Sequence, residues 1–390
     1  MIMGALTRRE FVKRALTAGL GASVVSCAGI ESLSPQPGED EQVGLEEPTP
    51  LAGELHEARY YTTLDDNVIQ CQMCWRKCTV PENGLGFCRN KTNVSGKYYT
   101  RVYAKPCALQ IDPIEKEPAF HVLPGGTIFC TGTASCNNRC KHCHNWHMSQ
   151  KSVDETINYF APPSKVVKLA MRNDCDAVSF TYNEPTVFYE QMFDTAKLAK
   201  ESGLKALFHT NGSMNPEPLF ALLEHVDAVT VDLKAFTDVF YQQVSSSELW
   251  PVLRTLENIR KAGKHLEIVN LVIPTKNDDL DDIKRMCVWI KETLGDEVPL
   301  HFTRFSPAYK LTSLLPTPVE TLEAAAGIAD EEGLQYVYIG NVPGHERNST
   351  FCPKCGKAII SRVHFSVLSL DVEHGKCQFC GHEIPGIWWD

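Results

Sequence analysis

Strands and helices alternate through the middle of this 390-residue chain, and the alternation limits the folds that the chain can adopt. Short apolar runs predict buried strands, and amphipathic patterns such as residues 186–202 and 249–262 predict helices between them. The predicted strands are residues 127–131, 177–182, 205–209, 228–233, 266–273, 300–305 and 336–339. Strands that alternate with crossover helices pair in parallel, so we expect an α/β fold built as a partial TIM-like (βα)6 barrel.

Polar motifs stand at the ends of several predicted strands. Residues 136–143 follow the first strand, Glu184 follows the second and Asn211 follows the third. Asp232 and Lys234 lie at the end of the fourth. In barrels of this kind the loops after the strands converge on one face, where the chemistry takes place. We therefore expect these motifs to meet in one pocket.

Cys136, Cys140 and Cys143 form a CxxxCxxC motif directly after the first predicted strand. Thiolates are the usual ligands of iron–sulfur clusters, and a [4Fe–4S] cube normally takes four cysteines. Three cysteines leave one iron open to a ligand from outside the protein. A zinc site is the alternative for an isolated motif of this spacing. Its place in the barrel, with the later motifs in order, favours a catalytic [4Fe–4S] cluster.

Two CxxCG knuckles close to the C-terminus predict a zinc site. Cys352 and Cys355 form the first knuckle, Cys377 and Cys380 form the second, and the strand-like residues 357–363 lie between them. This is the layout of a zinc ribbon, in which four thiolates surround the ion in a closed tetrahedral site. An auxiliary iron–sulfur cluster is the alternative. We expect a zinc-ribbon-like module over residues 346–390.

A third cysteine group lies in a Cys-rich N-terminal region, residues 57–122. Its spacing is CxxCx₃Cx₉C, and it lacks the evenly spaced ferredoxin run that ends in proline. Zinc is favoured, and a second cluster that relays electrons is the alternative. The members of this group are Cys71, Cys74, Cys78 and Cys88. Four cysteines outside the groups are predicted to be buried small apolar residues: Cys107, Cys130, Cys175 and Cys287.

Residues 60–390 resemble the radical S-adenosylmethionine (SAM) enzymes of the AmmeMemoRadiSam system, which are relatives of pyruvate formate-lyase activating enzyme. The resemblance is carried by Cys71-Gln-Met-Cys74, Gly86-Phe-Cys88, Ile111-Asp-Pro-Ile-Glu-Lys-Glu-Pro118, Cys136–Trp146, Phe180-Thr-Tyr-Asn-Glu-Pro185, Val231-Asp-Leu-Lys-Ala-Phe236, His301-Phe-Thr-Arg-Phe305 and Tyr338-Ile-Gly-Asn341. It implies a radical SAM core over residues 123–345.

The resemblance also implies an activity. Such an enzyme reductively cleaves SAM at its [4Fe–4S] cluster and gives a 5′-deoxyadenosyl radical, which takes a hydrogen atom from a substrate. The implied partners are an electron donor and either a protein substrate or a Memo-like protein. A glycyl-radical enzyme activase is the first alternative. A non-catalytic iron–sulfur or zinc protein that binds or transfers electrons is the second.

The family's SAM-binding positions map onto residues of this chain. Asn145 matches an Asn that helps to bind SAM, and Glu184 stands where a GGE motif holds the SAM ammonium. Asp232 and Lys234 match an Asp-Leu-Lys motif near the ribose and carboxylate, and His301 matches a SAM-contacting His on a late strand. The neutral side chain of Asn211 completes the predicted set. Two departures stand out: the GGE sequence is absent, and His209 occupies a position where activating enzymes often carry an acid.

The N-terminal residues predict export. Arg8 and Arg9 precede a Gly- and Ala-rich apolar run, so residues 1–30 resemble a Tat signal, and a lipobox-like pattern makes Cys27 a candidate membrane tether. The acidic, Pro-rich residues 31–56 predict a disordered linker. The signal favours a periplasmic or membrane-anchored location; the cytoplasm, which supplies SAM and reductant, is the alternative. A net charge of −10 disfavours nucleic acid as a partner.

Overall fold

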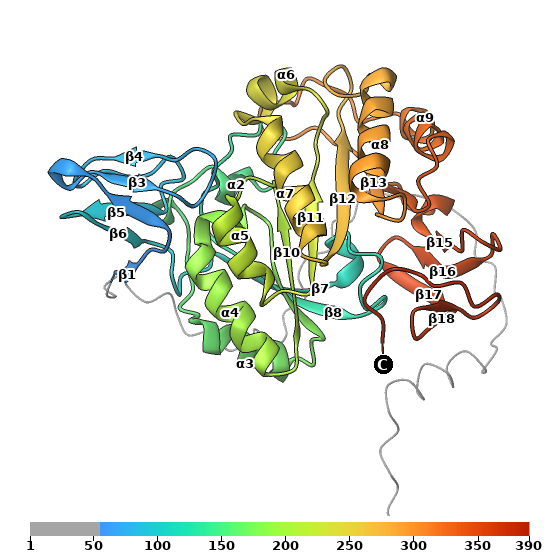
Figure 1. The fold of residues 1–390 in the computed structure, drawn as a ribbon, viewed down its shortest axis with the longest axis horizontal. Coiled ribbons are helices and arrows are strands. Elements are labelled where there is room, and N and C mark those ends of the chain that lie inside the picture. Colours follow the sequence, from blue (N-terminus) through green and yellow to red (C-terminus); the bar gives the residue numbers. More distant parts are fainter. Residues whose placement is uncertain (1–54, 390) are drawn as a thin grey trace, which may run out of the picture. The chain divides into compact units, whose positions relative to one another are not determined.

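The computed structural model of the protein describes residues 55–389 (Figure 1). The predicted export signal, Cys27 and nearly all of the predicted linker lie outside the described residues. Within the described part of the chain, no helix is long and apolar enough to span a bilayer.

An eight-stranded sheet forms the centre of the fold, in the order β14-β13-β12-β11-β10-β9-β8-β7. Seven strands are parallel: β8 (Thr127–Gly132), β9 (Ala177–Phe180), β10 (Lys205–Thr210), β11 (Ala228–Asp232), β12 (His265–Val272), β13 (Leu300–Arg304) and β14 (Val337–Gly340). They match the seven predicted strands closely, and the α/β prediction is confirmed. The pairing runs from β14 to β7 without closing among the described strands, so the sheet is open and has seven parallel strands where six βα units were expected.

The edge strand β7 (Ala108–Pro113) was not predicted from the sequence. It pairs antiparallel with β8, from Ala108 opposite Gly132 to Pro113 opposite Thr127. Gln110 and Ile111 are exposed and the buried Asp112 is charged, so the strand lacks the apolar run that marks a strand buried on both faces.

Helices follow the parallel strands and cover one face of the sheet in Figure 1. They are α3 (Pro163–Arg172), α4 (Tyr189–Glu201), α5 (Pro216–Leu223), α7 (Leu249–Lys261), α8 (Leu280–Leu294) and α9 (Val319–Glu331). Each buries an apolar stripe and exposes most of its charged residues, as the amphipathic patterns predicted; Glu190 of α4 is buried. The helix α8 begins at Asp279, whose carboxylate accepts hydrogen bonds from the amides of Asp281 and Asp282.

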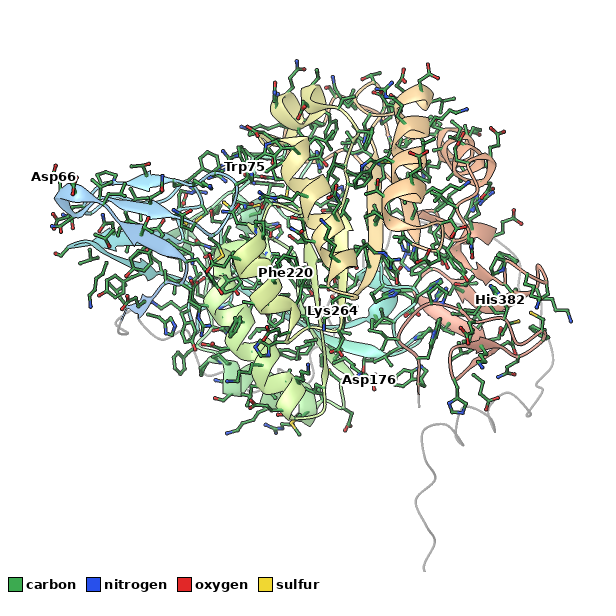
Figure 2. All side chains as sticks on the ribbon, viewed as in Figure 1. Asp66, Trp75, Asp176, Phe220, Lys264 and His382 are labelled. Carbon is green, nitrogen blue, oxygen red and sulfur yellow. The ribbon has the colours of Figure 1, made fainter. Side chains whose placement is uncertain are left out.

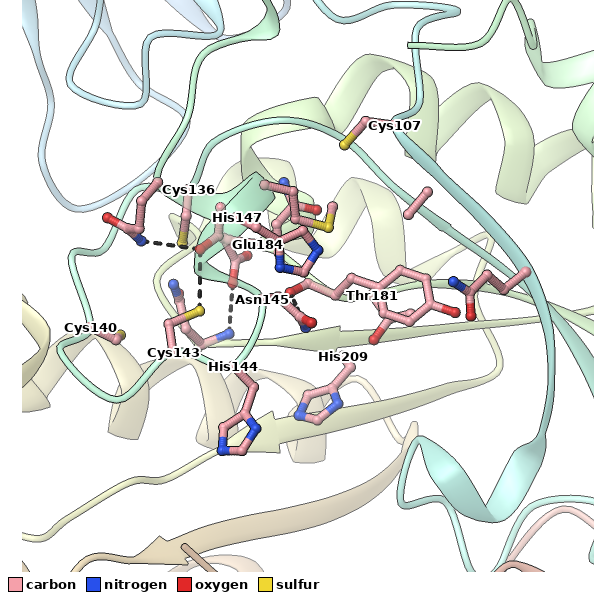
Figure 3. Close-up of a pocket in the computed structure, with 18 of the residues that line it drawn as sticks. Cys107, Cys136, Cys140, Cys143, His144, Asn145, His147, Thr181, Glu184 and His209 are labelled. Atoms are coloured by element: carbon pink, nitrogen blue, oxygen red, sulfur yellow. Dashed lines mark hydrogen bonds between the residues drawn. The ribbon is translucent and has the colours of Figure 1, made fainter. Parts of the chain in front are cut away.

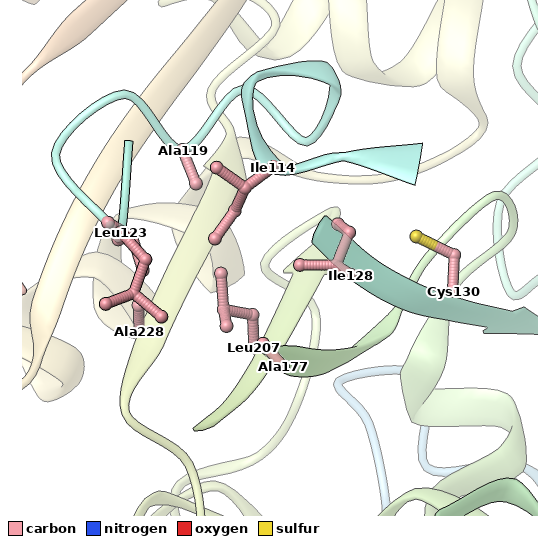
Figure 4. Close-up of a cluster of buried hydrophobic side chains, with 9 residues drawn as sticks. Ile114, Ala119, Leu123, Ile128, Cys130, Ala177, Leu207 and Ala228 are labelled. Atoms are coloured by element: carbon pink, nitrogen blue, oxygen red, sulfur yellow. The ribbon is translucent and has the colours of Figure 1, made fainter. Parts of the chain in front are cut away.

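Short elements complete the core. They are α2 (Trp146–Ser149), α6 (Asp238–Phe240), the π-helical turn η5 (Tyr241–Ser245) and the 3-10 turns η1 (Asp65–Asn67), η2 (Ile114–Lys116), η3 (Val153–Glu155), η4 (Pro185–Phe188) and η6 (Glu346–Asn348). Segment 114–123 packs over the N-terminal ends of β8 to β11 (Figure 4). Ile114 and Leu123 contact Ile128, Leu207 and Ala228 there in a buried apolar cluster. This segment therefore closes the end of the sheet at which the parallel strands begin.

The N-terminal region consists of two small antiparallel sheets. One has the order β1 (His56–Glu57), β6 (Lys97–Thr100), β5 (Lys91–Val94), and the other β2 (Tyr61–Thr63), β3 (Ile69–Cys71), β4 (Thr79–Val80). A buried ion pair between Lys91 and Glu190 joins this region to α4. Breaking one partner of such a pair would leave an uncompensated buried charge, so the contact fixes the region against the core.

The C-terminal residues form a compact β module. It contains β15 (Thr350–Phe351), β16 (Ala358–Val363), β17 (Ser366–Leu370), β18 (Val372–Glu373) and β19 (Lys376–Cys377), and β16 confirms the strand predicted at 357–363. Ile359 and Ile360 of β16 pack against Phe120 and Tyr338 of the core. The buried Arg362 guanidinium lies 3.4 Å from a carboxylate oxygen of Glu115 and stacks on Phe120. The module therefore shares its hydrophobic interior with the sheet.

Candidate active site

A cavity of about 900 Å³ opens where the parallel strands β8 to β11 end (Figure 3). The strands deliver their last residues and the loops that follow them to this one edge, as expected for a parallel α/β sheet. The predicted cluster and SAM residues that line the cavity are Cys136, Cys140, Cys143, Asn145, Glu184, Asn211, Asp232 and Lys234. The predicted convergence is therefore present for every one of these residues, and His301 alone lies elsewhere.

The cysteine loop runs from the end of β8 to α2 and is held by main-chain hydrogen bonds. The amides of Arg139 and Lys141 donate to the carbonyls of Ser245 and Val244 in η5, each at 2.9 Å. The amide of Asn138 donates to Cys136 Sγ at 3.3 Å. Amide donors of this kind stabilise a sulfur that carries negative charge, as a cluster ligand does.

The three cysteines of the loop are placed to hold a metal centre in the cavity. Cys136, Cys140 and Cys143 line one cavity, yet within residues 55–389 their Sγ atoms do not all lie within 4.8 Å of one another. Burial raises the pKa of the Cys140 thiol to about 12, so a metal must replace the proton to make this thiolate at neutral pH. A three-cysteine [4Fe–4S] site would supply that metal, with each sulfur on a different iron.

Glu184 is buried at the base of the cavity and held in one orientation. Its Oε1 accepts hydrogen bonds from the Thr186 amide at 3.0 Å and from Thr210 Oγ1 at 2.8 Å, and its Oε2 accepts from the Asn211 amide at 2.7 Å. Burial raises the pKa of this carboxyl, against the lowering effect of these donors. Oε2 keeps room for a further donor, since each carboxylate oxygen has about two acceptor positions.

A second charged group lies at the ends of β10 and β11. Asp232 Oδ1 contacts Lys234 Nζ at 2.6 Å and His209 Nε2 at 3.2 Å, and His209 Nδ1 lies 3.6 Å from Glu117 Oε2. Burial alone would raise the pKa of Asp232, but Lys234 and His209 hold it well below its usual value. For His209, burial lowers the pKa, but Asp232 and Glu117 outweigh it and raise the value to about 9. His209 is therefore protonated at neutral pH.

Asparagine side chains connect the loops around the cavity. Asn145 Nδ2 donates to the Tyr182 carbonyl at 2.8 Å, and Asn211 Nδ2 donates to Asn137 Oδ1 at 2.9 Å. Asn183 Nδ2 donates to the Ser135 carbonyl at 2.7 Å, which ties the cysteine loop to the end of β9. The buried Asn211 Oδ1 has no hydrogen-bond partner among the described residues. A buried acceptor of this kind is costly unless a ligand satisfies it.

His301 does not line the cavity. It is the second residue of β13 and lies near the start of the strand, whereas the cavity is at the strand ends. Its Nε2 is 2.6 Å from Glu267 Oε2, and its ring stacks on Tyr338 at 4.8 Å between centroids. This placement does not support the SAM contact that the family resemblance implies, because register puts the side chain into the packed end of the sheet.

The structure adds residues that the sequence did not assign to the site. Asp112, Lys116 and Glu117 reach the cavity from β7 and η2, and His209 lies among them. In the sequence, residues 111–118 pointed to the family, but the motif gave no function for Asp112, Lys116 or Glu117. Of the cysteines predicted to be buried, Cys130, Cys175 and Cys287 are, but Cys107 is only partly buried and lines the cavity. That prediction is wrong for Cys107 because β7, which follows it, forms the cavity rim.

Sequence comparison with known proteins identifies the family of this chain. The profile of the radical SAM superfamily matches residues 131–287. An uncharacterised protein of Methanocaldococcus jannaschii is 46% identical over 332 residues, which cover 85% of this chain and 99% of that protein. The chain belongs to the radical SAM superfamily. Membership implies a [4Fe–4S] cluster and SAM, for which the cysteine loop and the cavity provide fitting residues.

More distant similarities concern part of this radical SAM chain. Pyruvate formate-lyase 1-activating enzyme of Escherichia coli is 23% identical over 228 residues, which cover 55% of this chain and 92% of that enzyme. A solved radical SAM methyltransferase from Sphaerobacter thermophilus aligns with 56% of this chain and 67% of its own, at 13% identity and a TM-score of 0.44.

Proposed function

We propose that the protein is an enzyme that reductively cleaves SAM at a [4Fe–4S] cluster bound by Cys136, Cys140 and Cys143. The cluster and SAM together supply a 5′-deoxyadenosyl radical, which abstracts a hydrogen atom from the substrate. The observation that carries the proposal is the convergence of these cysteines, Glu184 and the Asp232–Lys234 pair on one cavity.

The residues of the chain provide complementary partners for the polar groups of SAM. Glu184 Oε2 faces the cavity wall with acceptor capacity left, which suits the SAM ammonium. Lys234 and the protonated His209 bring positive charge for the SAM carboxylate, while Asp232 orients both of them. Asn211 Oδ1 offers an acceptor for a ribose hydroxyl or an amino group. These charged and polar side chains would bind SAM and fix its orientation in the cavity.

SAM cleavage tests this proposal. We expect the anaerobically reconstituted full chain, reduced with dithionite, to release 5′-deoxyadenosine and methionine, measured by chromatography. Cys136→Ala, Cys140→Ala and Cys143→Ala should each abolish release. Cys175→Ala is the control, since this buried cysteine lies outside the cavity. Release at the wild-type rate by any of the three variants would refute the cluster assignment.

We further propose that the enzyme is of the Memo-associated type. Support comes from the family motifs spread over residues 60–390. A Memo-like protein should then bind this chain in solution and alter its products. The second candidate, a glycyl-radical activase, is favoured by the similarity to pyruvate formate-lyase 1-activating enzyme. That activity would appear as a glycyl-radical EPR signal on a partner protein.

For the C-terminal module we propose a structural zinc ion. The four Sγ atoms of Cys352, Cys355, Cys377 and Cys380 lie within 4.8 Å of one another, with Cys352–Cys380 at 3.6 Å and Cys355–Cys377 at 3.8 Å. A tetrahedral ion with zinc–sulfur bonds of about 2.3 Å separates its sulfurs by about 3.8 Å. Metal analysis should find one zinc that Cys377→Ala removes.

We also propose that residues 1–30 direct export through the Tat pathway and that Cys27 carries a lipid anchor. Fractionation of cells that produce the full chain would test this. Arg8→Lys combined with Arg9→Lys should move the protein to the cytoplasm, and Cys27→Ala should release it from the membrane fraction. A cytoplasmic wild-type protein would contradict the export proposal.

A further inference from the structure

The four cysteines of the N-terminal region surround one buried side chain, Tyr98. Cys71 ends β3, Cys78 precedes β4, and the Cys71 amide donates to the Cys78 carbonyl at 2.9 Å. The buried Tyr98 of β6 is close enough to all four thiolates to be affected by the charge of each. A Cβ on Gly86 would meet the Tyr98 hydroxyl at 2.5 Å and Cys88 Sγ at 3.9 Å, so glycine is needed for this close approach.

Backbone amides are placed to support negative sulfurs in this group. The amides of Met73, Arg76 and Asn90 interact with the thiols of Cys71, Cys74 and Cys88, in each case from two residues further along the chain. The amide of Asn138 stands in the same relation to Cys136. The N-terminal group therefore shares this backbone pattern with the cluster loop and also with the C-terminal module, where the amides of Lys357 and His382 stand in the same relation to Cys355 and Cys380.

The sulfur spacing in this group differs from that in the C-terminal module. Around Cys352 and its three partners the Sγ atoms are within 4.8 Å of one another, and among residues 55–389 the N-terminal group does not reach that spacing. One zinc ion draws four sulfurs to about 3.8 Å. A [4Fe–4S] cube takes one cysteine at each of its four irons, so the sulfurs face a common centre but stay farther apart. The four cysteines of the N-terminal region supply the one thiolate per iron that such a cube takes.

The group lies directly against the catalytic cysteine loop. Arg139, which stands between Cys136 and Cys140, donates from Nη2 to the Phe87 carbonyl at 2.7 Å, and Phe87 precedes Cys88. The Arg139 guanidinium also lies over the Phe87 ring, 4.3 Å from its centroid. Arg139 is near enough to be affected by the charges of both Cys88 and Cys136. A single layer of side chains therefore separates the two cysteine sets.

Two further contacts fix that arrangement. Arg76 Nε donates to the Asn137 carbonyl at 2.8 Å, and its guanidinium lies 3.8 Å from the centre of the Phe87 ring. Trp75, labelled in Figure 2, donates from its amide to the Ser213 carbonyl at 3.2 Å, just beyond β10. The N-terminal group is thus attached both to the cluster loop and to the strand ends.

We propose that Cys71, Cys74, Cys78 and Cys88 bind a second [4Fe–4S] cluster that passes electrons to the cluster of the cavity. A reduced one-electron carrier protein gives up one electron to the second cluster and is itself oxidised. The electron then moves to the first cluster and is consumed when the sulfonium–C5′ bond of SAM breaks. The last step rests on the proposed function, whereas the second metal site does not depend on it.

Metal analysis and EPR on three forms of the full chain test the site. The reconstituted wild type should hold about eight irons, counted from two four-iron cubes, and one zinc. Cys78→Ser combined with Cys88→Ser should lose about four irons and keep the zinc. The triple variant Cys136→Ala, Cys140→Ala, Cys143→Ala should keep about four irons and an EPR signal that SAM does not change. Cys175→Ser is the control for loss of an unrelated thiol.

The triple variant decides the question even if the double variant fails to fold. A triple variant without iron, or a wild type with two zinc ions and about four irons, would overturn the second cluster. Wild-type protein with about eight irons that fails to cleave SAM would leave the second cluster intact and refute the proposed function instead. The two failures are therefore distinguishable.

EPR line broadening and the rate of SAM cleavage test electron transfer between the two clusters. In the fully reduced wild type, the EPR signals should be broadened by spin–spin interaction between the two clusters, and each variant should lose the broadening. With reduced flavodoxin as donor, the Cys78→Ser, Cys88→Ser variant should cleave SAM at least about tenfold more slowly than wild type, while dithionite should restore most of the rate. Unbroadened wild-type signals, or equal rates with both reductants, would contradict the relay.

Discussion

Two buried carboxylates, Glu267 and Glu184, are used differently at the two ends of the parallel sheet. Where the strands begin, Glu267 is fully used: it accepts from the amides of Phe120 and His121 at 3.0 and 2.8 Å and pairs with His301 at 2.6 Å. Where the strands end, Asn211 Oδ1 is unsatisfied among the described residues, and Glu184 Oε2 has one protein donor. Satisfied groups stabilise a fold, and groups with spare capacity can bind a ligand.

The two cysteine groups that flank the core also lie at different ends of the sheet. The C-terminal module closes the starting end, where the Leu123 amide donates to the Ile387 carbonyl at 2.7 Å and Trp389 Nε1 donates to the Pro124 carbonyl at 3.0 Å. The N-terminal group contacts the cysteine loop at the open end. We infer that one metal site serves folding and the other serves the chemistry.

Loss of the C-terminal metal should give the largest effect. Cys377→Ala should lose one zinc and make residues 346–390 easy to proteolyse, because metal binding in such sites contributes about 10–16 kcal/mol to folding. Any soluble fraction should keep its cluster EPR signal and cleave SAM with dithionite. Cys175→Ala is the matched control. Loss of iron from Cys377→Ala would show that the two ends are not divided in this way.

Glu184→Gln tests the open end. The variant should retain the cluster but bind SAM about 10- to 150-fold more weakly, because a charge-assisted contact contributes about 1.5–3 kcal/mol. Titration of SAM into the reduced protein, followed by EPR, measures the change. Glu320→Gln on the exposed side of α9 is the control. Unchanged affinity with an intact cluster would assign Glu184 to structure only.

His209 should give the open end a distinctive pH dependence. Its folded-state pKa of about 9 lies above its ordinary 6.5, so protonated His209 stabilises the fold fully below pH 6.5, and this contribution is lost as pH rises through about 9. The melting temperature of the wild type should therefore exceed that of His209→Gln at neutral pH, and the difference should shrink above about pH 9. A difference that does not change with pH would contradict the Asp232–His209 ion pair.

His301→Gln should have the smallest effect on SAM. Affinity should stay within about twofold of wild type, since the side chain lies in the packed end, whereas loss of the buried hydrogen bond to Glu267 should cost about 1.5–3 kcal/mol of stability. SAM titration and thermal melting of the same preparation separate the two effects. Weakened SAM binding without a lower melting temperature would return His301 to the site.

Several elements were predictable because they depend on local pattern. The strands β8 to β14 are short and mostly apolar, and the rule that loops meet at the strand ends then predicted that Cys136, Glu184 and Asp232 come together. The side-chain direction of His301 depends on its position along β13, which the motif alone does not reveal. The polar edge strand β7 carries no apolar run, so its contribution of Asp112 was missed.

Metal identity was the hardest feature to predict. The motifs of Cys71–Cys74 and Cys352–Cys355 have the same CxxC spacing, and only for the second does the structure bring four sulfurs within 4.8 Å of one another. That separation is set by how β3, β4 and the loop before β5 are packed, which is tertiary information. The ion pairing of His209 was equally hidden, because Glu117 and Asp232 are far from it in the chain.

The central claim is that SAM binds the open iron of the cluster held by Cys136, Cys140 and Cys143. The most direct measurement is ENDOR on the reduced triple-serine variant of Cys71, Cys78 and Cys88, in which only the catalytic cluster gives a signal, with isotopically labelled SAM. We predict hyperfine coupling from the SAM amino nitrogen and carboxylate oxygen to the cluster, together with a changed EPR signal. An EPR signal that SAM leaves unchanged, with no coupling from either label, would contradict the claim.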